Sequence, residues 1–143
     1  MPAISQGSSF EEYRANFDAN PYHQYLGVTV VEQKPGYGKI VLKKGETTPG
    51  GIGGSVHGGV LAAMVDIVML VAIFAEMREG EVPAGTAELS GTYLRQAHGE
   101  NIYAEGRVIK RGRQLSLVEV DITDDEGRLC ARGRTLYAFR AGG

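Results

Sequence analysis

The chain has 143 residues, which is enough for one domain with a hydrophobic core and short for two. Its 15 Lys and Arg residues against 17 Asp and Glu residues give a net charge of −2, which excludes charge-driven binding to nucleic acid or to an anionic membrane. The single cysteine, Cys130, excludes an internal disulfide and a cysteine-based zinc site. Because the N-terminal sequence MPAISQGSSF lacks the basic-then-apolar order of a signal peptide, we expect a cytoplasmic protein.

The N-terminal third of the chain predicts short helices followed by a hairpin. Ser9 and Glu12 have the spacing of a helix cap, and with the aromatic residues that follow they predict a short helical segment over residues 9–26. Two strand-like runs on either side of the turn KPGYG predict a hairpin over residues 28–44. A glycine-rich loop separates this hairpin from the next element.

The sequence VLAAMVDIVMLVAIFA, residues 60–75, is the most apolar part of the chain, and Asp66 is its only residue that is not apolar. Its 16 residues are short for a membrane span, which needs about 20. The apolar residues occupy every face of a helix, so the helix must be buried on most sides. We therefore expect a central helix over about residues 57–79, with Gly80 as its C-terminal cap.

After Pro83 the hydrophobic pattern changes to a period of two, and we expect antiparallel strands over residues 85–140. The expected strands are 86–94, 101–111, 114–123 and 129–139, joined by turns such as DDEG. With the first hairpin they give about six strands and one long helix. Only a sheet that wraps around the helix covers its whole circumference, so the predicted fold is α+β, in a single domain over residues 1–143.

Glycine is concentrated in one segment, because six of the 21 glycines fall within residues 50–59. The last two, Gly58 and Gly59, stand where the central helix is expected to begin. Glycine lets the backbone approach a ligand closely, and the N–H groups of a helix N-terminus carry positive partial charge. This segment therefore predicts either a mobile loop or a site for an oxyanion.

Asp66 is the second candidate site residue. A carboxylate in a dry core costs several kcal/mol unless it is compensated, so its retention predicts an active-site role, an ion pair or a helix edge that reaches solvent. Gly58 lies eight residues away, or roughly 12 Å along a helix at 1.5 Å per residue. The two groups cannot act on one substrate within one chain. If they belong to one active site, the spacing predicts a homodimer in which each site takes one group from each subunit.

The motif His57-Gly58-Gly59, with Asp66 seven residues later, resembles the hotdog-fold acyl-CoA thioesterases of the phenylacetate-degradation type. The resemblance covers roughly residues 20–140 and is supported by the runs TYLRQA, residues 92–97, and KRGR, residues 110–113. It implies the hotdog fold, an antiparallel sheet of about six strands wrapped around one long central helix. It also implies homodimers, often paired into homotetramers, that hydrolyse acyl-CoA thioesters at the subunit interface.

The resemblance also implies roles for individual residues. Asp66 is expected to be the nucleophile or general base, and the Gly58 N–H of the other subunit is expected to polarise the thioester carbonyl. His57 is expected to position the loop and the thioester, and Thr86 to orient the attacking water. The predicted substrate-binding residues are Gly59, Lys110, Arg111 and Arg113, of which the three basic residues would meet the phosphates of coenzyme A. This chain has Gly51 where the family often has Asn.

Two other functions remain open from the sequence. A hotdog dehydratase or hydratase acting on acyl thioesters needs an acid/base pair, and a non-catalytic module would bind acyl-CoA without turnover. We expect no metal site, since His23 and His98 fall in predicted surface segments without a second ligand at metal spacing. We also expect no cofactor, because coenzyme A is part of the substrate, and neither nucleic acid nor membrane as a partner.

Overall fold

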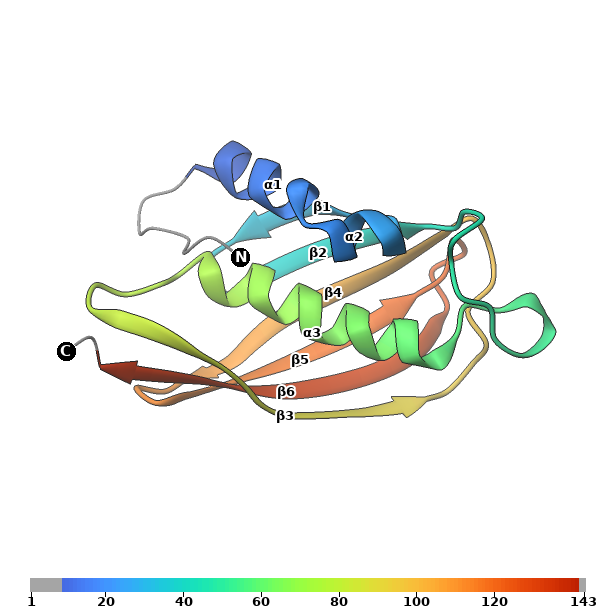
Figure 1. Ribbon diagram of the computed structural model, residues 1–143. Coiled ribbons are helices and arrows are strands. Elements are labelled where there is room, and N and C mark those ends of the chain that lie inside the picture. Colours follow the sequence, from blue (N-terminus) through green and yellow to red (C-terminus); the bar gives the residue numbers. More distant parts are fainter. Residues whose placement is uncertain (1–8, 142–143) are drawn as a thin grey trace.

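The computed structural model describes residues 9–141, so residues 1–8 of the N-terminal sequence discussed above lie outside the described residues. The chain forms one six-stranded antiparallel sheet with a long helix, α3, along one of its faces (Figure 1). The elements in chain order are α1 (Phe10–Ala19), α2 (Pro21–Leu26), β1 (Val28–Lys34), β2 (Tyr37–Lys43), the 3-10 turn η1 (Ile52–Gly54), α3 (Gly58–Phe74), β3 (Glu81–Tyr93), β4 (Asn101–Arg111), β5 (Leu115–Thr123) and β6 (Leu129–Ala141). The expected α+β fold class is confirmed.

The strands lie in the order β1-β2-β4-β5-β6-β3. Neighbours that follow one another in the chain, such as β4, β5 and β6, pair through short turns. β3 comes directly after α3, yet it pairs with the last strand, β6, and forms one edge of the sheet. Within residues 9–141, β3 is therefore one of the two edge strands of the sheet, and β1 is the other.

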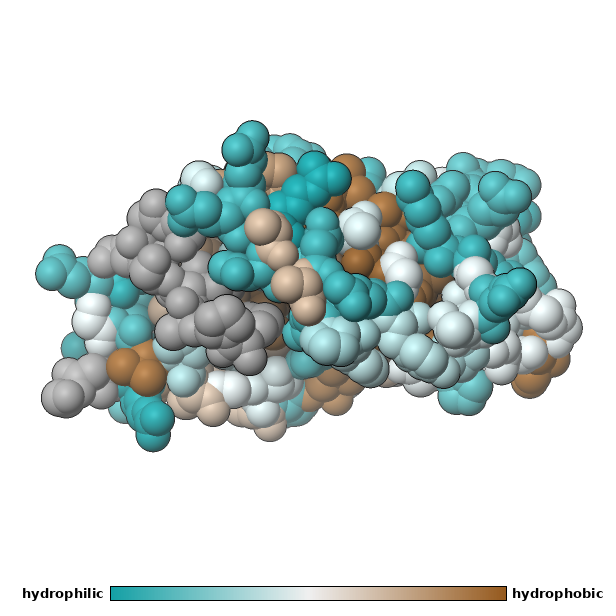
Figure 2. Space-filling view, turned by 45° about the horizontal axis from the view of Figure 1, so that its top comes forward, coloured by the Kyte–Doolittle hydropathy of each residue, from teal (hydrophilic) through white to brown (hydrophobic). Residues whose placement is uncertain are grey.

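The N-terminal helices form as the sequence predicts. The Ser9 side chain caps α1 by accepting a hydrogen bond from the Glu12 N–H at 3.1 Å, and Tyr13 and Phe17 turn their rings into the core. One expectation is wrong here: His23 is buried, stacked on Phe17 with ring centroids 3.9 Å apart, because α2 folds back on α1. The face that carries these helices is mostly hydrophilic (Figure 2).

α3 lies close to the sheet because three strands present glycine beneath it. A Cβ atom built on Gly133 of β6 would lie 2.8 Å from both methyl groups of Val65, and one on Gly38 of β2 would lie 2.7 Å from a methyl group of Val71. A Cβ atom built on Gly106 of β4 would lie 3.3 Å from the carbonyl oxygen of Val68, which is a tight contact. Real Cβ atoms essentially never lie within 3.0 Å of another heavy atom, so these glycines, Gly38 and Gly133 above all, set the distance between helix and sheet.

Two boundaries differ from the expected ones. α3 ends at Phe74 and not near residue 79, because the chain reverses at Gly80, whose φ is +81°, so that β3 can start at Glu81. β3 therefore contains Pro83, although the sequence predicts strands only after this proline. The sheet tolerates this proline because β3 is an edge strand and its register shifts between Pro83 and Gly85.

The sheet packs along α3, and in the described chain one stripe of the helix is only half-buried. The half-buried positions Ala62, Asp66, Leu70 and Phe74 recur every fourth residue and form one stripe along the helix. Within residues 9–141, no helix has the length and hydropathy that a membrane span requires.

Candidate active site

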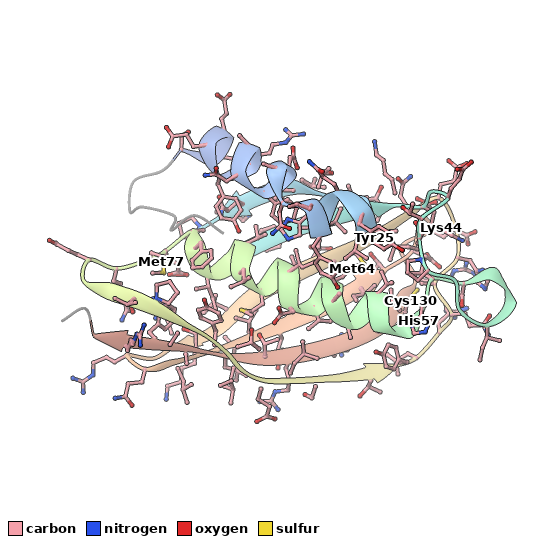
Figure 3. All side chains as sticks on the ribbon, in the orientation of Figure 1. Tyr25, Lys44, His57, Met64, Met77 and Cys130 are labelled. Carbon is pink, nitrogen blue, oxygen red and sulfur yellow. The ribbon has the colours of Figure 1, made fainter. Side chains whose placement is uncertain are left out.

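The N-terminus of α3 carries the first group of candidate residues. His57 is the N-cap, and its Nδ1 atom accepts a hydrogen bond of 2.9 Å from the Gly59 N–H. Within residues 9–141, the Gly58 N–H has no acceptor, as expected for the first residue of a helix. Figure 3 places His57 at the end of α3 next to the glycine-rich loop, and Met77 beyond the opposite end. The predicted free donor at the helix start is thus present.

The glycine-rich loop is held against this terminus by its backbone. Gly51 donates to the Ser55 carbonyl, His57 donates to the Pro49 carbonyl, and Val56 donates to the Ala97 carbonyl just beyond β3. A Cβ atom on Gly51 would lie 3.0 to 3.3 Å from Ser55, Val56 and His57, so this loop conformation has little room for a side chain there. The observed loop conformation therefore favours glycine at position 51, where the resemblance described above implies Asn.

A cavity of about 470 Å³ opens at the helix N-terminus. Its walls come from the loop, from the first turns of α3 and from the segment after β3, and they include His57, Gly58, Leu61, Tyr93 and Gln96. The hydroxyl of Tyr93 donates a hydrogen bond of 2.8 Å to the Gly58 carbonyl oxygen. This arrangement has apolar walls and one free N–H donor, that of Gly58, at one end.

Asp66 lies on the half-buried stripe of α3, on the side that faces β3. Its Oδ1 atom accepts a hydrogen bond of 2.7 Å from the Thr86 hydroxyl. Tyr137, the cross-strand neighbour of Thr86, is buried, and its burial together with the negative charge of Asp66 raises the pKa of its phenol. The structure therefore brings Asp66 and Thr86 together and places Tyr137, which sequence reasoning did not single out, opposite Thr86 on β6.

Asp66 and Gly58 remain separate within one chain. Both belong to the regular helix α3, eight residues apart, which corresponds to about 12 Å along its axis. A catalytic carboxylate must come within about 3 Å of its target, directly or through one water. Within one chain, the Gly58 N–H and the Asp66 carboxylate are therefore too far apart to act on the same reacting atom.

The predicted basic residues lie at the other end of the sheet, below the C-terminal end of α3 (Figure 1). Arg111 forms a 2.5 Å ion pair with Glu81, and both side chains are nearly buried, at 8% and 13% exposure. Its guanidinium also stacks on Phe139, 3.9 Å from the ring centroid. Arg111 thus holds β4 to β3 and β6, while Lys110 remains exposed.

Arg113 lines an open hollow of about 960 Å³, together with Arg78 and Arg140. These three arginines come from the β4–β5 turn, from the segment after α3 and from the end of β6, so only the folded chain groups them. Sequence reasoning found Arg113 because it is part of the run KRGR, and missed the other two. Within residues 9–141, no three His, Cys, Asp or Glu side chains form a group that could hold a metal ion.

The family model described as "Thioesterase superfamily" matches residues 53–131, which include the α3 N-terminus, Asp66 and Thr86. The chain belongs to the thioesterase superfamily. It is 32% identical over 137 residues to the human protein named acyl-coenzyme A thioesterase 13, which covers 94% of this chain and 95% of that protein.

Solved structures of thioesterases share the fold. The structure of zebrafish thioesterase superfamily member 2 has 28% identity and a TM-score of 0.79, and covers 92% of this chain and 99% of that one. The structure of the Escherichia coli PaaI protein, from the phenylacetic acid degradation operon, has a TM-score of 0.78 at 17% identity over 93% of this chain and 94% of that one. The chain is therefore a hotdog-fold thioester hydrolase.

Proposed function

We propose that this thioesterase hydrolyses acyl-CoA thioesters to a carboxylic acid and free coenzyme A, at two sites that a homodimer shares. The observation that carries the shared site is the separation of Gly58 and Asp66 along one helix, which keeps either group from completing a site alone. The acyl-CoA substrate is supported by the similarity over 94% of the chain to a protein named acyl-coenzyme A thioesterase.

β3 supports the dimer. It is a 13-residue edge strand, and its residues from Thr86 to Tyr93 are exposed although Leu89 and Tyr93 are large and apolar or aromatic. A long edge strand with free N–H and C=O groups pairs readily with a second copy. Antiparallel pairing of β3 with the partner's β3 would also cover the half-buried stripe of α3 and set the partner's Gly58 near Asp66.

The proposed reaction is the addition of water to the thioester carbonyl and the loss of coenzyme A as a thiol. Asp66, oriented by Thr86, would take a proton from the attacking water or attack the carbonyl carbon itself. The partner's Gly58 N–H would stabilise the negative charge that develops on the carbonyl oxygen. The carbon–sulfur bond then breaks, and the sulfur leaves with a proton as the free thiol.

The arginine group accounts for the other end of the substrate. In an antiparallel β3 pair, the Glu81 end of one strand lies beside the Tyr93 end of the other. Arg78, Arg113 and Arg140 of one chain would then lie near the cavity of its partner. Their positive charge exceeds the negative charge of Glu79 and Glu81 in the same hollow, and it suits the phosphates of coenzyme A. Lys110 and Gly59 are further substrate contacts in this proposal, whereas Arg111 would act mainly by supporting the turn.

The proposal includes no cofactor, since neither water addition nor thiol release changes the oxidation state of the substrate. It also includes a cytoplasmic location, in keeping with the lone buried Cys130 and the absence of any possible disulfide. The proposal also includes the pairing of two dimers into a homotetramer. Measurement of the molecular mass in solution tests both the formation of the dimer and its pairing into a tetramer.

The decisive experiment mixes two inactive variants. Asp66→Asn removes the base, and Gly58→Pro removes the backbone N–H. Proline suits position 58 because this is the first residue of α3. The preceding residue, His57, has the extended conformation that proline requires before it, with φ −55° and ψ 136°. Each variant alone is expected to release almost no thiol from acyl-CoA. A hybrid dimer contains one intact site, so equal mixing with full exchange restores about a quarter of the wild-type rate.

The controls separate the alternatives. Mass-labelled chains show whether hybrids form, and hybrids without activity would contradict shared sites. Wild-type enzyme that changes the absorbance of an enoyl thioester without releasing thiol would indicate a dehydratase or hydratase. Tight binding of acyl-CoA with neither signal would indicate a binding module.

A further inference from the structure

The hydroxyl of Tyr93 connects the edge strand to the helix N-terminus. Tyr93 is the last residue of β3, and its hydroxyl donates to the Gly58 carbonyl oxygen at 2.8 Å. Its ring lies against the same glycine, because a Cβ atom on Gly58 would be 3.5 Å from Cε1 and 3.6 Å from Cζ. Since Tyr93 is 56% exposed, burial of the ring does not account for this placement. The contact is directed at the backbone of the first helical turn.

The contact continues through the peptide between Gly58 and Gly59. The carbonyl of this peptide accepts from Tyr93, and its N–H donates to Nδ1 of His57 at 2.9 Å. A carbonyl oxygen has two acceptor positions, so the contact leaves room for the ordinary helical bond to Ala62. A donor on the carbonyl strengthens the N–H of the same peptide, because hydrogen bonds in a chain polarise one another.

This chain of hydrogen bonds determines where the proton of His57 lies. An Nδ1 atom that accepts a hydrogen bond carries no proton, so the neutral imidazole carries its proton on Nε2. His57 is exposed, and it lines the same cavity as Gly58. The Gly58 N–H and the His57 Nε2–H therefore belong to one short segment whose geometry Tyr93 holds.

We propose that Tyr93 is a positioning residue of the thioesterase site, which fixes the first turn of α3 and holds His57 as the Nε2–H tautomer. This inference rests on the proposed function, because the two donors matter only if a thioester oxygen binds there. In the proposed dimer β3 joins the two subunits, and the Tyr93 side chain links this strand to the oxyanion donors. Binding of the partner to β3 is therefore coupled to the geometry of these donors.

Tyr93→Phe tests the proposal, because it keeps the ring and removes only the hydroxyl. We expect kcat for acyl-CoA hydrolysis to fall about 10-fold, the effect of one hydrogen bond, while KM stays within about two-fold of the wild-type value. Tyr25→Phe on α2 is the matched control, since Tyr25 is similarly exposed at 54%, and it should leave both constants unchanged. A kcat of Tyr93→Phe within two-fold of wild type would overturn the proposal.

The nitrogen spectrum of the imidazole gives a readout that does not depend on turnover. The chain has three histidines, so the ¹⁵N signals of His57 can be assigned by substitution of His23 and His98. The wild type should show the Nε2–H tautomer, and Tyr93→Phe should show a mixture of tautomers and a weaker hydrogen bond at the Gly59 amide. An unchanged spectrum in this variant would overturn the proposal even if kcat fell. If the wild type releases no thiol, the proposed function fails, and the spectrum still decides whether Tyr93 orders His57.

Discussion

The hydroxyl oxygen of Thr86 lies 2.7 Å from Oδ1 of Asp66, although 20 residues separate them in the chain. The contact joins the half-buried stripe of α3 to the exposed edge strand. It leaves the second carboxylate oxygen of Asp66 without a partner among residues 9–141, and so available to a water or a carbonyl carbon.

Thr86→Val replaces the hydroxyl by a methyl group and keeps the β-branched shape that suits a strand. We expect kcat to fall about 10-fold or more, because a hydrogen bond to a charged group is worth about 1.5 to 3 kcal/mol, with little change in KM. Thr86→Ser is the matched control, since it retains the hydroxyl, and its kcat should stay close to that of the wild type. Equal rates for Val and Ser at position 86 would show that the contact has no part in turnover.

Arg113→Gln should weaken the binding of acyl-CoA without changing the rate of the chemical step. We expect KM for acyl-CoA to rise about 3- to 10-fold, the effect of one solvent-exposed charge pair with a phosphate. A thioester of N-acetylcysteamine has no phosphates, so its KM should be the same for the variant and the wild type. Arg107→Gln, an exposed arginine paired with Glu105, is the control. A parallel rise in KM for both substrates would contradict a phosphate contact.

Gly133→Ala should destabilise the fold, because the added Cβ would lie 2.8 Å from both methyl groups of Val65. We expect the free energy of unfolding in urea to fall by about 1 to 3 kcal/mol, the usual cost of overpacking. Val65→Ala in the same chain removes both methyl groups and makes room for the new one. The double variant should therefore lose less stability than the sum of the two single variants, and strict additivity would rule out the contact as the cause.

The stability of the protein should depend on His23 in mildly acidic solution. Burial lowers the pKa of its imidazole below 6.5, although the Phe17 carbonyl and the charge of Asp18 oppose this shift. The unfolded chain then binds a proton at a higher pH than the folded chain does, so stability is fully present above pH 6.5 and is lost as the pH falls below it. The urea midpoint should decline from pH 7.5 to 5.5.

His23→Gln should reduce this decline, because glutamine does not titrate. His98→Gln removes an exposed histidine from the segment between β3 and β4, and it should leave the pH profile as in the wild type. A profile that is the same in all three proteins would assign the pH dependence to other groups.

Most of the fold could be predicted from local signals in the sequence. The Ser9 cap, the first hairpin and the strands from residue 101 onward depend on neighbouring residues, and their predicted ranges agree with the structure to within a few residues. The end of α3 and the start of β3 depend on a distant partner. Pairing of Glu81 with Ala141 extends β3 past Pro83, and no local pattern contains that information.

The candidate site shows the same division. The free Gly58 N–H and the half-buried Asp66 follow from their places on an apolar helix, and Thr86 from the resemblance to thioesterases. Tyr93 and Tyr137 could not be found in this way, because strand alternation does not tell which tyrosine reaches the helix. Arg78, Arg113 and Arg140 come together only in the folded chain. The C-terminal end of α3, the β4–β5 turn and the end of β6 then lie at the same end of the sheet.

The glycines under α3 also affect the distance between the two chains of the proposed dimer. Gly38, Gly106 and Gly133 lie on three different strands and receive Val71, Val68 and Val65, so the helix has a single register on the sheet. Sliding by one turn, about 5.4 Å, would move the valines away from these glycines. The position of Asp66 relative to the second chain of the proposed dimer therefore depends on three glycines below the helix, which have no side chain and take no part in the chemistry.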